Sequence, residues 1–136
     1  IGWCDWSSDV CSSDLLTPHR GPWQDAGIAR TAEQFVTPVP VICQGIHPGT
    51  RPPSDSFLSV DAPNVIVSAL KLAEEPEASG DLILRCYETA GRPAQATIDM
   101  RFARKQWSGA FRPSEIKTLR IDPKTGDIRE VSALEE

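Results

Sequence analysis

Residue types that commonly bind metals are scarce in this chain of 136 residues, which has two histidines and four cysteines. His19 and His47 have no partner at the spacing that metal ligands usually show, and no Cys-x-x-Cys occurs. We therefore predict no metal-binding residue, and no cofactor-binding residue, in this chain.

The sequence also has no long apolar run. No stretch approaches the ~20 apolar residues that a membrane helix needs, so we expect the chain neither to span nor to bind a membrane. No targeting segment is visible. Two thiols, Cys43 and Cys86, suit a reducing compartment if they are free, which predicts a cytoplasmic location. A disulfide between them stays open, because connectivity depends on geometry.

An excess of positive charge is missing as well. The formal net charge is -5, whereas a nucleic-acid partner would need a clustered basic face, so we predict no nucleic-acid partner. Arg101, Arg104 and Lys105 form the densest basic group, which we interpret as a solvated turn. Hydrophobic residues at 40% and charged residues at 24% are typical of a globular chain, and the length suits one domain.

The first residues need a separate interpretation. Residues 5–15 resemble the translation of a sequencing-library adapter, and segments of that kind are excluded from reasoning about a fold. We expect residues 1–15 to be an artefact and the natural chain to begin near Leu16, within a longer reading frame.

One short helix is predicted after that point. Apolar residues recur at steps of three and four over Trp23–Val36, which is typical of an amphipathic helix. Pro22 suits the first turn of a helix and Pro38 prevents its continuation. Residues 37–56 are rich in proline and glycine and predict an extended connector, with a short strand possible at Val39–Gln44.

After Ser56 the pattern changes to short apolar runs divided by turn residues, which predicts an all-β fold. Without helices between the strands, parallel pairing is excluded and an antiparallel β-sandwich of about seven strands follows. The predicted strands are 57–61, 64–73, 81–89, 94–103, 108–112, 115–122 and 128–134.

Two of these strands allow a statement about their surroundings. Along 94–103, alternate residues are apolar and should face the core, while the others face solvent. The apolar set is Ala94, Ala96, Ile98, Met100 and Phe102. The strand at 64–73 does not alternate, so we predict that it lies centrally in its sheet.

Five segments, in order along the chain, point to a family. The most informative is the strand Arg85-Cys86-Tyr87-Glu88 with the turn at Gly91, and the others are 18–23, 56–60, 64–71 and 113–120. In that order and at those spacings, they resemble the C-terminal β-domain of glycoside hydrolase family 38 α-mannosidases.

This resemblance implies a division of labour. It makes residues 16–56 a helix and connector from the preceding domain, and residues 57–136 the C-terminal β-sandwich. The parent would be a zinc-dependent retaining glycosidase that acts on α-mannosides and removes terminal α-mannosyl residues. Its catalytic domain, N-terminal in the same chain, would supply the zinc ligands and the nucleophile and would be the main partner. No catalytic residue is assigned here.

The positions of the acidic residues agree with the absence of a catalytic residue from this chain. Glu74, Glu75, Glu77 and Asp81 cluster in a predicted loop, where we expect ordinary solvated charges. Asp99 falls on the polar face of a strand. A catalytic carboxylate needs a cleft and a shifted pKa, which surface loops seldom provide.

Four residues remain as candidates for an interface or for proximity to sugar. We interpret Arg85, Tyr87 and Glu88 as fixing the domain by cross-strand pairing, with Lys71 as a partner for Glu88. The alternative is that this edge faces the catalytic domain and shapes its sugar pocket. Trp107, expected at a turn, is a candidate for an exposed aromatic platform, which would suit a stand-alone carbohydrate-binding or interaction module. The sequence leaves these alternatives open.

Overall fold

The computed structural model describes residues 15–37, 39–46, 48–50, 52–74 and 80–135. The expectation that residues 1–15 are an artefact therefore falls outside the described residues, except at Leu15. The chain forms two compact units, residues 1–40 and 41–136, and each is described by itself.

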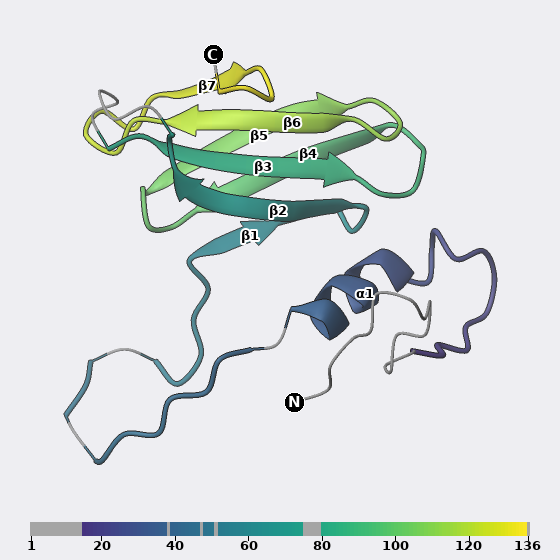
Figure 1. Cartoon of the computed structure of the whole chain (residues 1–136), viewed down its shortest axis with the longest axis horizontal. Coiled ribbons are helices and arrows are strands. Elements are labelled where there is room, and N and C mark those ends of the chain that lie inside the picture. The colour runs from purple at the N-terminus through teal and green to yellow at the C-terminus, as the bar shows by residue number, and fades with distance from the viewer. Residues whose placement is uncertain (1–14, 38, 47, 51, 75–79, 136) are drawn as a thin grey trace, which may run out of the picture. The chain divides into compact units, whose positions relative to one another are not determined.

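The first unit contains the helix α1, Ile28–Val36 (Figure 1). It begins five residues later than predicted. Gly27, at φ 67°, lies in the left-handed region and interrupts the helical path. Before it, the amides of Asp25 and Ala26 donate to the carbonyls of Pro22 and Trp23 in tight turns. No residue of α1 is buried within the described chain.

The connector has no strand among its described residues, so the short strand predicted at Val39–Gln44 is wrong. A strand requires a hydrogen-bonded neighbour, and Pro40 lacks the amide that would donate to one. Val41 and Ile42 are exposed instead.

The second unit is a β-sandwich of two antiparallel sheets (Figure 1). One sheet has the order β1-β4-β5 and the other the order β2-β3-β6-β7. The predicted all-β fold, with seven strands and one short helix, is confirmed. The strands are β1 Leu58–Val60, β2 Val65–Leu72, β3 Leu82–Glu88, β4 Ala94–Met100, β5 Lys105–Phe111, β6 Ile116–Ile121 and β7 Ile128–Val131.

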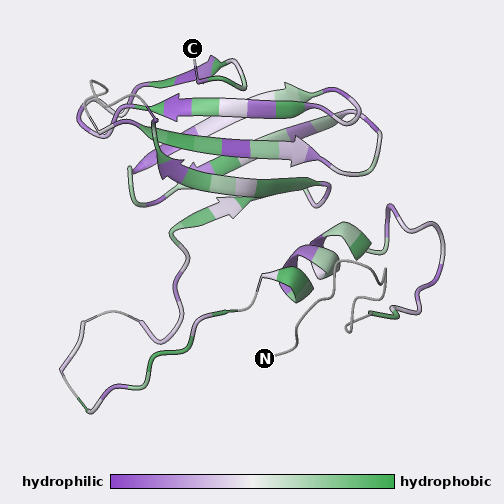
Figure 2. Ribbon diagram, in the orientation of Figure 1, coloured by the Kyte–Doolittle hydropathy of each residue, from purple (hydrophilic) through white to green (hydrophobic). Residues whose placement is uncertain are grey.

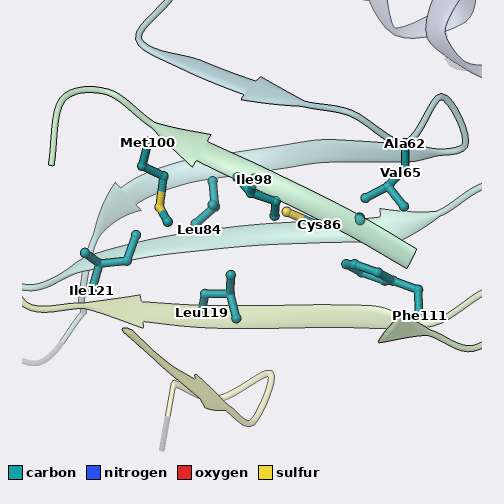
Figure 3. Packing of buried hydrophobic residues seen from close by; sticks show 10 residues of the cluster. Ala62, Val65, Leu84, Cys86, Ile98, Met100, Phe111, Leu119 and Ile121 are labelled. Atoms are coloured by element: carbon teal, nitrogen blue, oxygen red, sulfur yellow. The ribbon is translucent and has the colours of Figure 1, made fainter. Parts of the chain in front are cut away.

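The core lies between the sheets, and side chains from both contribute to it (Figure 3). Ala96, Ile98 and Met100 of β4 are fully buried, as the alternation predicts. Phe102 was also expected there but is 37% exposed, because a tight turn begins at Arg101 and ends the alternation. The core cluster consists of Ala62, Val65, Leu84, Cys86, Ala96, Ile98, Met100, Phe111, Leu119 and Ile121.

The prediction that β2 lies centrally is wrong, because β2 is an edge strand and β3 and β6 are the inner strands. Its pairing with β3 shifts between Val67 and Ala69, and this irregularity obscures the alternation in the sequence. Beyond it, Leu70 and Leu72 are exposed at the open edge. The hydropathy of the individual strands can be followed in Figure 2.

The basic group forms the solvated turn that was predicted. Arg101, Arg104 and Lys105 are all exposed, and they lie in or beside the turn between β4 and β5. Arg101 pairs with the carboxylates of Asp55 and Asp99, at 3.0 and 3.6 Å.

Candidate functional site

The segment that suggests the family lies on β3, at the centre of the four-stranded sheet. Leu84 and Cys86 point into the core. Arg85 and Tyr87 therefore lie on the opposite, outer face, because side chains alternate along a strand. The two cysteines of the described residues, Cys43 and Cys86, are free, and burial raises the pKa of the Cys86 thiol to about 12.

Arg85 joins three parts of the outer face. Its Nε donates to Thr118 Oγ1 of β6 at 3.4 Å, and its Nη2 donates to the carbonyl of Ala133 at 2.9 Å. Arg85 therefore makes a cross-strand hydrogen bond to β6, and its role in fixing the domain stays a prediction. Tyr87 stands opposite Ile66 of β2 and Ile116 of β6.

Glu88 ends β3 and is only 3% exposed. Its carboxylate accepts hydrogen bonds from Asn64 Nδ2 at 2.8 Å and from the amide of Ser114 at 2.8 Å. It also accepts from the amides of Ala90, Gly91 and Arg92, at 2.7, 2.9 and 3.3 Å. One side chain thus links three loops: the loop between β1 and β2, the loop between β3 and β4, and the loop between β5 and β6.

These contacts decide the charge state of Glu88. Burial by itself would raise the pKa of the carboxyl group, because it removes water from the charged form. The hydrogen bonds from Ser114, Ala90, Asn64 and Gly91 more than offset that effect, and the pKa lies below its ordinary value. Glu88 is therefore an ionised structural anchor at neutral pH.

The predicted pair between Lys71 and Glu88 does not form. Glu88 stands opposite Val65, at the far end of β2 from Lys71. Lys71 Nζ instead pairs with Glu74 and with Glu135, the latter at 2.7 Å.

Trp107 lies within β5 rather than at a turn, so that part of the prediction is wrong. Its ring meets the ring of Phe111 edge-on, with centroids 6.0 Å apart, and packs against the core. Gly109 makes room for it, since a Cβ at that position would collide with the Trp107 ring. The indole is half-buried between these neighbours.

The structure does not bring the four candidates into one cleft. Arg85 and Tyr87 share the outer face of the four-stranded sheet, Glu88 is buried at the end of β3, and Trp107 belongs to the other sheet. A role of any of them near sugar, or in an interface, stays a prediction.

The carboxylates of the predicted acidic loop differ from one another. Glu75 and Glu77 are outside the described residues. Asp81 was expected to be solvated, but its side chain is 12% exposed and binds Arg120 Nε at 2.8 Å. Arg120 is on β6 opposite Ile83, so the start of β3 brings Asp81 within its reach.

Two hollows lie in the described parts of the chain. A groove of about 400 Å³ in the first unit is lined mainly by apolar side chains, with His19, Trp23 and Phe35 among them. A polar hollow of about 310 Å³ in the sandwich is lined by Asp81, Arg120, Asp122, Asp127 and Arg129. Amide hydrogen bonds from Lys124 and Thr125 lower the pKa of Asp122, which favours its ionised form.

Metal ligands do not gather in the part of the chain that the structure describes: no three His, Cys, Asp or Glu side chains are placed to hold an ion. Within the same residues, no helix is long and apolar enough to cross a membrane.

Comparison with known proteins adds to this geometry. Residues 64–109, from β2 into β5, match the family described as "Glycosyl hydrolases family 38 C-terminal beta sandwich domain". This part of the chain is therefore similar to a family 38 C-terminal β-sandwich. It is also similar to Alpha-mannosidase 2C1 of Homo sapiens, with 34% identity over 77 residues. That alignment covers 56% of this chain and 7% of the human protein, so the chain spans only a small part of that relative's length. No solved structure matches the chain.

Proposed function

We propose that this chain is the structural C-terminal domain of an α-mannosidase, and that it takes no part in bond cleavage itself. The parent would be a zinc-dependent retaining glycosidase that removes terminal α-mannosyl residues. The observation that carries the structural role is the environment of Glu88. Its five protein donors occupy about all of the lone-pair positions that a carboxylate offers, so the side chain has no capacity left for a sugar.

The other carboxyl groups support the same division of labour. A retaining glycosidase needs two carboxyl groups about 5 to 5.5 Å apart, and the acid of the pair needs a raised pKa. Five carboxyl groups of the described residues have a pKa that lies clearly below its ordinary value instead. These groups are Asp61, Glu88, Glu115, Asp122 and Glu135. The acid/base chemistry would then belong to another domain of the parent.

The proposed zinc does not fit this chain, because the described residues offer no set of ligands for it. We assign the metal to the catalytic domain of the parent, and no step of the reaction is derived through it here.

The first unit supplies a surface for that domain. Trp23 and Phe35 are each 47% exposed beside the apolar groove, and α1 has no buried residue. An amphipathic helix of nine residues is too short to be stable alone. We therefore propose that residues 15–37 dock on the catalytic domain of the same polypeptide, where their apolar face would leave water.

The alternative of a carbohydrate-binding module predicts an exposed aromatic platform. Trp107 was the candidate, and its contacts with Phe111 and Gly109 weigh against that role. A titration of the purified chain with mannose separates the two functions. The structural role predicts no saturable change in Trp fluorescence, whereas saturable binding would favour the module.

The experiment for the proposed parent uses the whole α-mannosidase of which this chain would be one domain. The whole protein should hydrolyse 4-nitrophenyl α-mannoside and should lose that activity when a chelator removes zinc. Substitution Glu88→Ala in the whole protein should lower its melting temperature while leaving the KM of the folded fraction unchanged. A whole protein with no turnover of α-mannosides would contradict the assignment of the parent.

A further inference from the structure

Three strands place one cation each on the outer face of the four-stranded sheet. Lys71 of β2 and Arg120 of β6 stand on either side of Ile83 of β3, and Arg85 follows two residues along β3. We call Lys71, Arg85 and Arg120 the cationic face. Ile83 lies among them and is fully buried, although it is not part of the core between the sheets.

The segment Ser132–Glu135, which follows β7, covers this face. Arg85 Nη2 donates to the carbonyl of Ala133 at 2.9 Å, and Arg120 Nη1 donates to the carbonyl of Glu135 at 3.1 Å. The Glu135 carboxylate binds Lys71 Nζ at 2.7 Å and accepts from the amide of Glu74 at 3.0 Å. Each residue of the cationic face therefore contacts this one segment.

The segment is a tight turn with an unfavourable backbone. The amide of Glu135 donates to the carbonyl of Ser132 at 3.0 Å, which closes the turn. Glu135 has φ 71°, a conformation that residues with a Cβ seldom adopt. Its side chain is also only 8% exposed, although burial of a charge is costly unless it is paired. Contacts with the cationic face offset both costs, so this shape of the turn depends on docking.

The core does not depend on the segment in the same way. All residues of the core cluster precede Asp122 in the sequence. Leu134 is 80% exposed, and the contacts of the segment with the cationic face are polar. A segment held in this manner can leave while the two sheets stay packed.

We propose that Ser132–Glu135 is a strap that docks reversibly on the cationic face, and that this face recognises a peptide turn with one acidic side chain. The contacts divide the recognition into two parts. Arg85 and Arg120 bind backbone carbonyls, which any peptide has, whereas Lys71 binds the carboxylate. When the strap is open, the face is a site for an acidic peptide of a partner.

A charge exchange tests the strap in the full chain. Glu135→Lys should repel the cationic face and open the strap, and Lys71→Glu should do the same. The double variant restores opposite charges and should close it. Hydrogen exchange followed by NMR shows whether the strap is docked or open, because we expect the amides of Glu74 and Glu135 to be protected from exchange only in the docked form. We expect at least tenfold faster exchange at both amides in the single variants. In the double variant we expect recovery at the amide of residue 135 alone, because the carboxylate that accepts from the Glu74 amide is absent there.

The amides between β3 and β6 serve as the internal control, and their exchange should not change. General loss of protection in the single variants would contradict the proposal, because the segment would then belong to the cooperative fold. Failure of the double variant to restore protection at the amide of residue 135, which donates to the carbonyl of Ser132, would also contradict it. If Glu135→Lys does not fold, Glu135→Gln provides the same comparison with a smaller expected increase in exchange.

A peptide tests the recognition. The probe is acetyl-Ser-Ala-Leu-Glu-amide, which has the sequence of the strap, and its matched control has Gln in place of Glu. Added to the Glu135→Lys variant, the probe should shift the NMR signals of Lys71 and Arg85 saturably, and the control should bind at least tenfold more weakly. The wild-type chain, whose face is covered, should not respond. Equal binding of the probe and its control, or no binding, would overturn recognition of the acidic side chain.

Discussion

Glu88 shows how a single residue organises one end of the sandwich. Its carboxylate receives donors from three different connections, and two of these connections use backbone conformations with positive φ, at Gly91 and Ser114. Hydrogen bonds to a charged group are stronger than those between neutral groups, and unpaired buried donors are costly. Loss of the charge should therefore affect all three connections at once.

We expect Glu88→Gln to lower the free energy of unfolding at pH 7 by about 2–4 kcal/mol, because an amide cannot accept from all of these donors. Urea denaturation of the two proteins measures this difference in the free energy of unfolding. Glu130→Gln is the matched control, since Glu130 is exposed and pairs with Lys117, and it should cost less than about 1 kcal/mol. Equal losses in the two variants would contradict the anchoring role.

The loss of stability caused by Glu88→Gln should depend on pH. The pKa of Glu88 is lowered in the folded protein, so its charge stabilises the fold fully above the ordinary value of 4.5. That contribution is lost as the pH falls through the lower pKa of the folded state. The difference in stability between the wild type and Glu88→Gln should therefore be constant from pH 7 to about pH 5 and should shrink below about pH 4. A difference that grows on acidification would contradict the lowered pKa.

Cys86 provides a second test at this scale. Its thiol is buried in the core and its pKa is raised to about 12 by burial, whereas Cys43 is exposed. At pH 8 in the folded chain, iodoacetamide should modify Cys43 but not Cys86, because the thiolate is the reactive form. Peptide mapping by mass spectrometry reads each site, and urea should make Cys86 reactive. Rapid modification of Cys86 without urea would place it outside the core.

The sequence predicts some of these residues and not others, for a physical reason. Burial of Cys86 was predictable because the strand begins with the apolar run Leu82-Ile83-Leu84 and Cys86 lies on the same face as Leu84. The partners of Glu88 were not predictable, because most of its donors are backbone amides that carry no sequence signal. The strap was missed for the same reason, since Arg85 and Arg120 bind carbonyls of residues 133 and 135.

At the level of elements, regular alternation was the reliable signal. It identified the buried face of β4, where neighbouring strands impose a single orientation on each side chain. The edge position of β2 could not be derived, because it depends on which strands pair, and the irregular pairing near Ser68 hides the alternation. The start of α1 was missed because one residue, Gly27, takes a left-handed conformation.

The alternation of β4 makes a direct prediction. Ile98→Asp would place an unpaired charge in the core and should lower the free energy of unfolding by about 4 kcal/mol or more, or prevent folding. Gln95→Asp is the control on the exposed side of the same strand, and we expect it to cost less than about 1 kcal/mol. Thermal unfolding followed by circular dichroism compares them. Wild-type stability of the Ile98 variant would contradict the assignment of the faces.

The whole molecule consists of a well-packed sandwich and a first unit with exposed apolar side chains. The sandwich has a complete core of its own, and its carboxylates are used in hydrogen bonds and ion pairs. The exposed Trp23 and Phe35 have the character of a surface that is covered in a larger protein. Both features agree with the proposed role of a structural domain in a larger enzyme.

The most direct test of this account is hydrolysis of 4-nitrophenyl α-mannoside by the purified chain, with and without added zinc, beside the whole parent protein at equal concentration. We predict turnover by the parent and none by the chain under either condition. No set of metal ligands gathers in the described residues, and the buried carboxylate of Glu88 has a lowered pKa and is occupied by protein donors. Turnover by the purified chain that a single substitution within it abolishes would contradict the structural role.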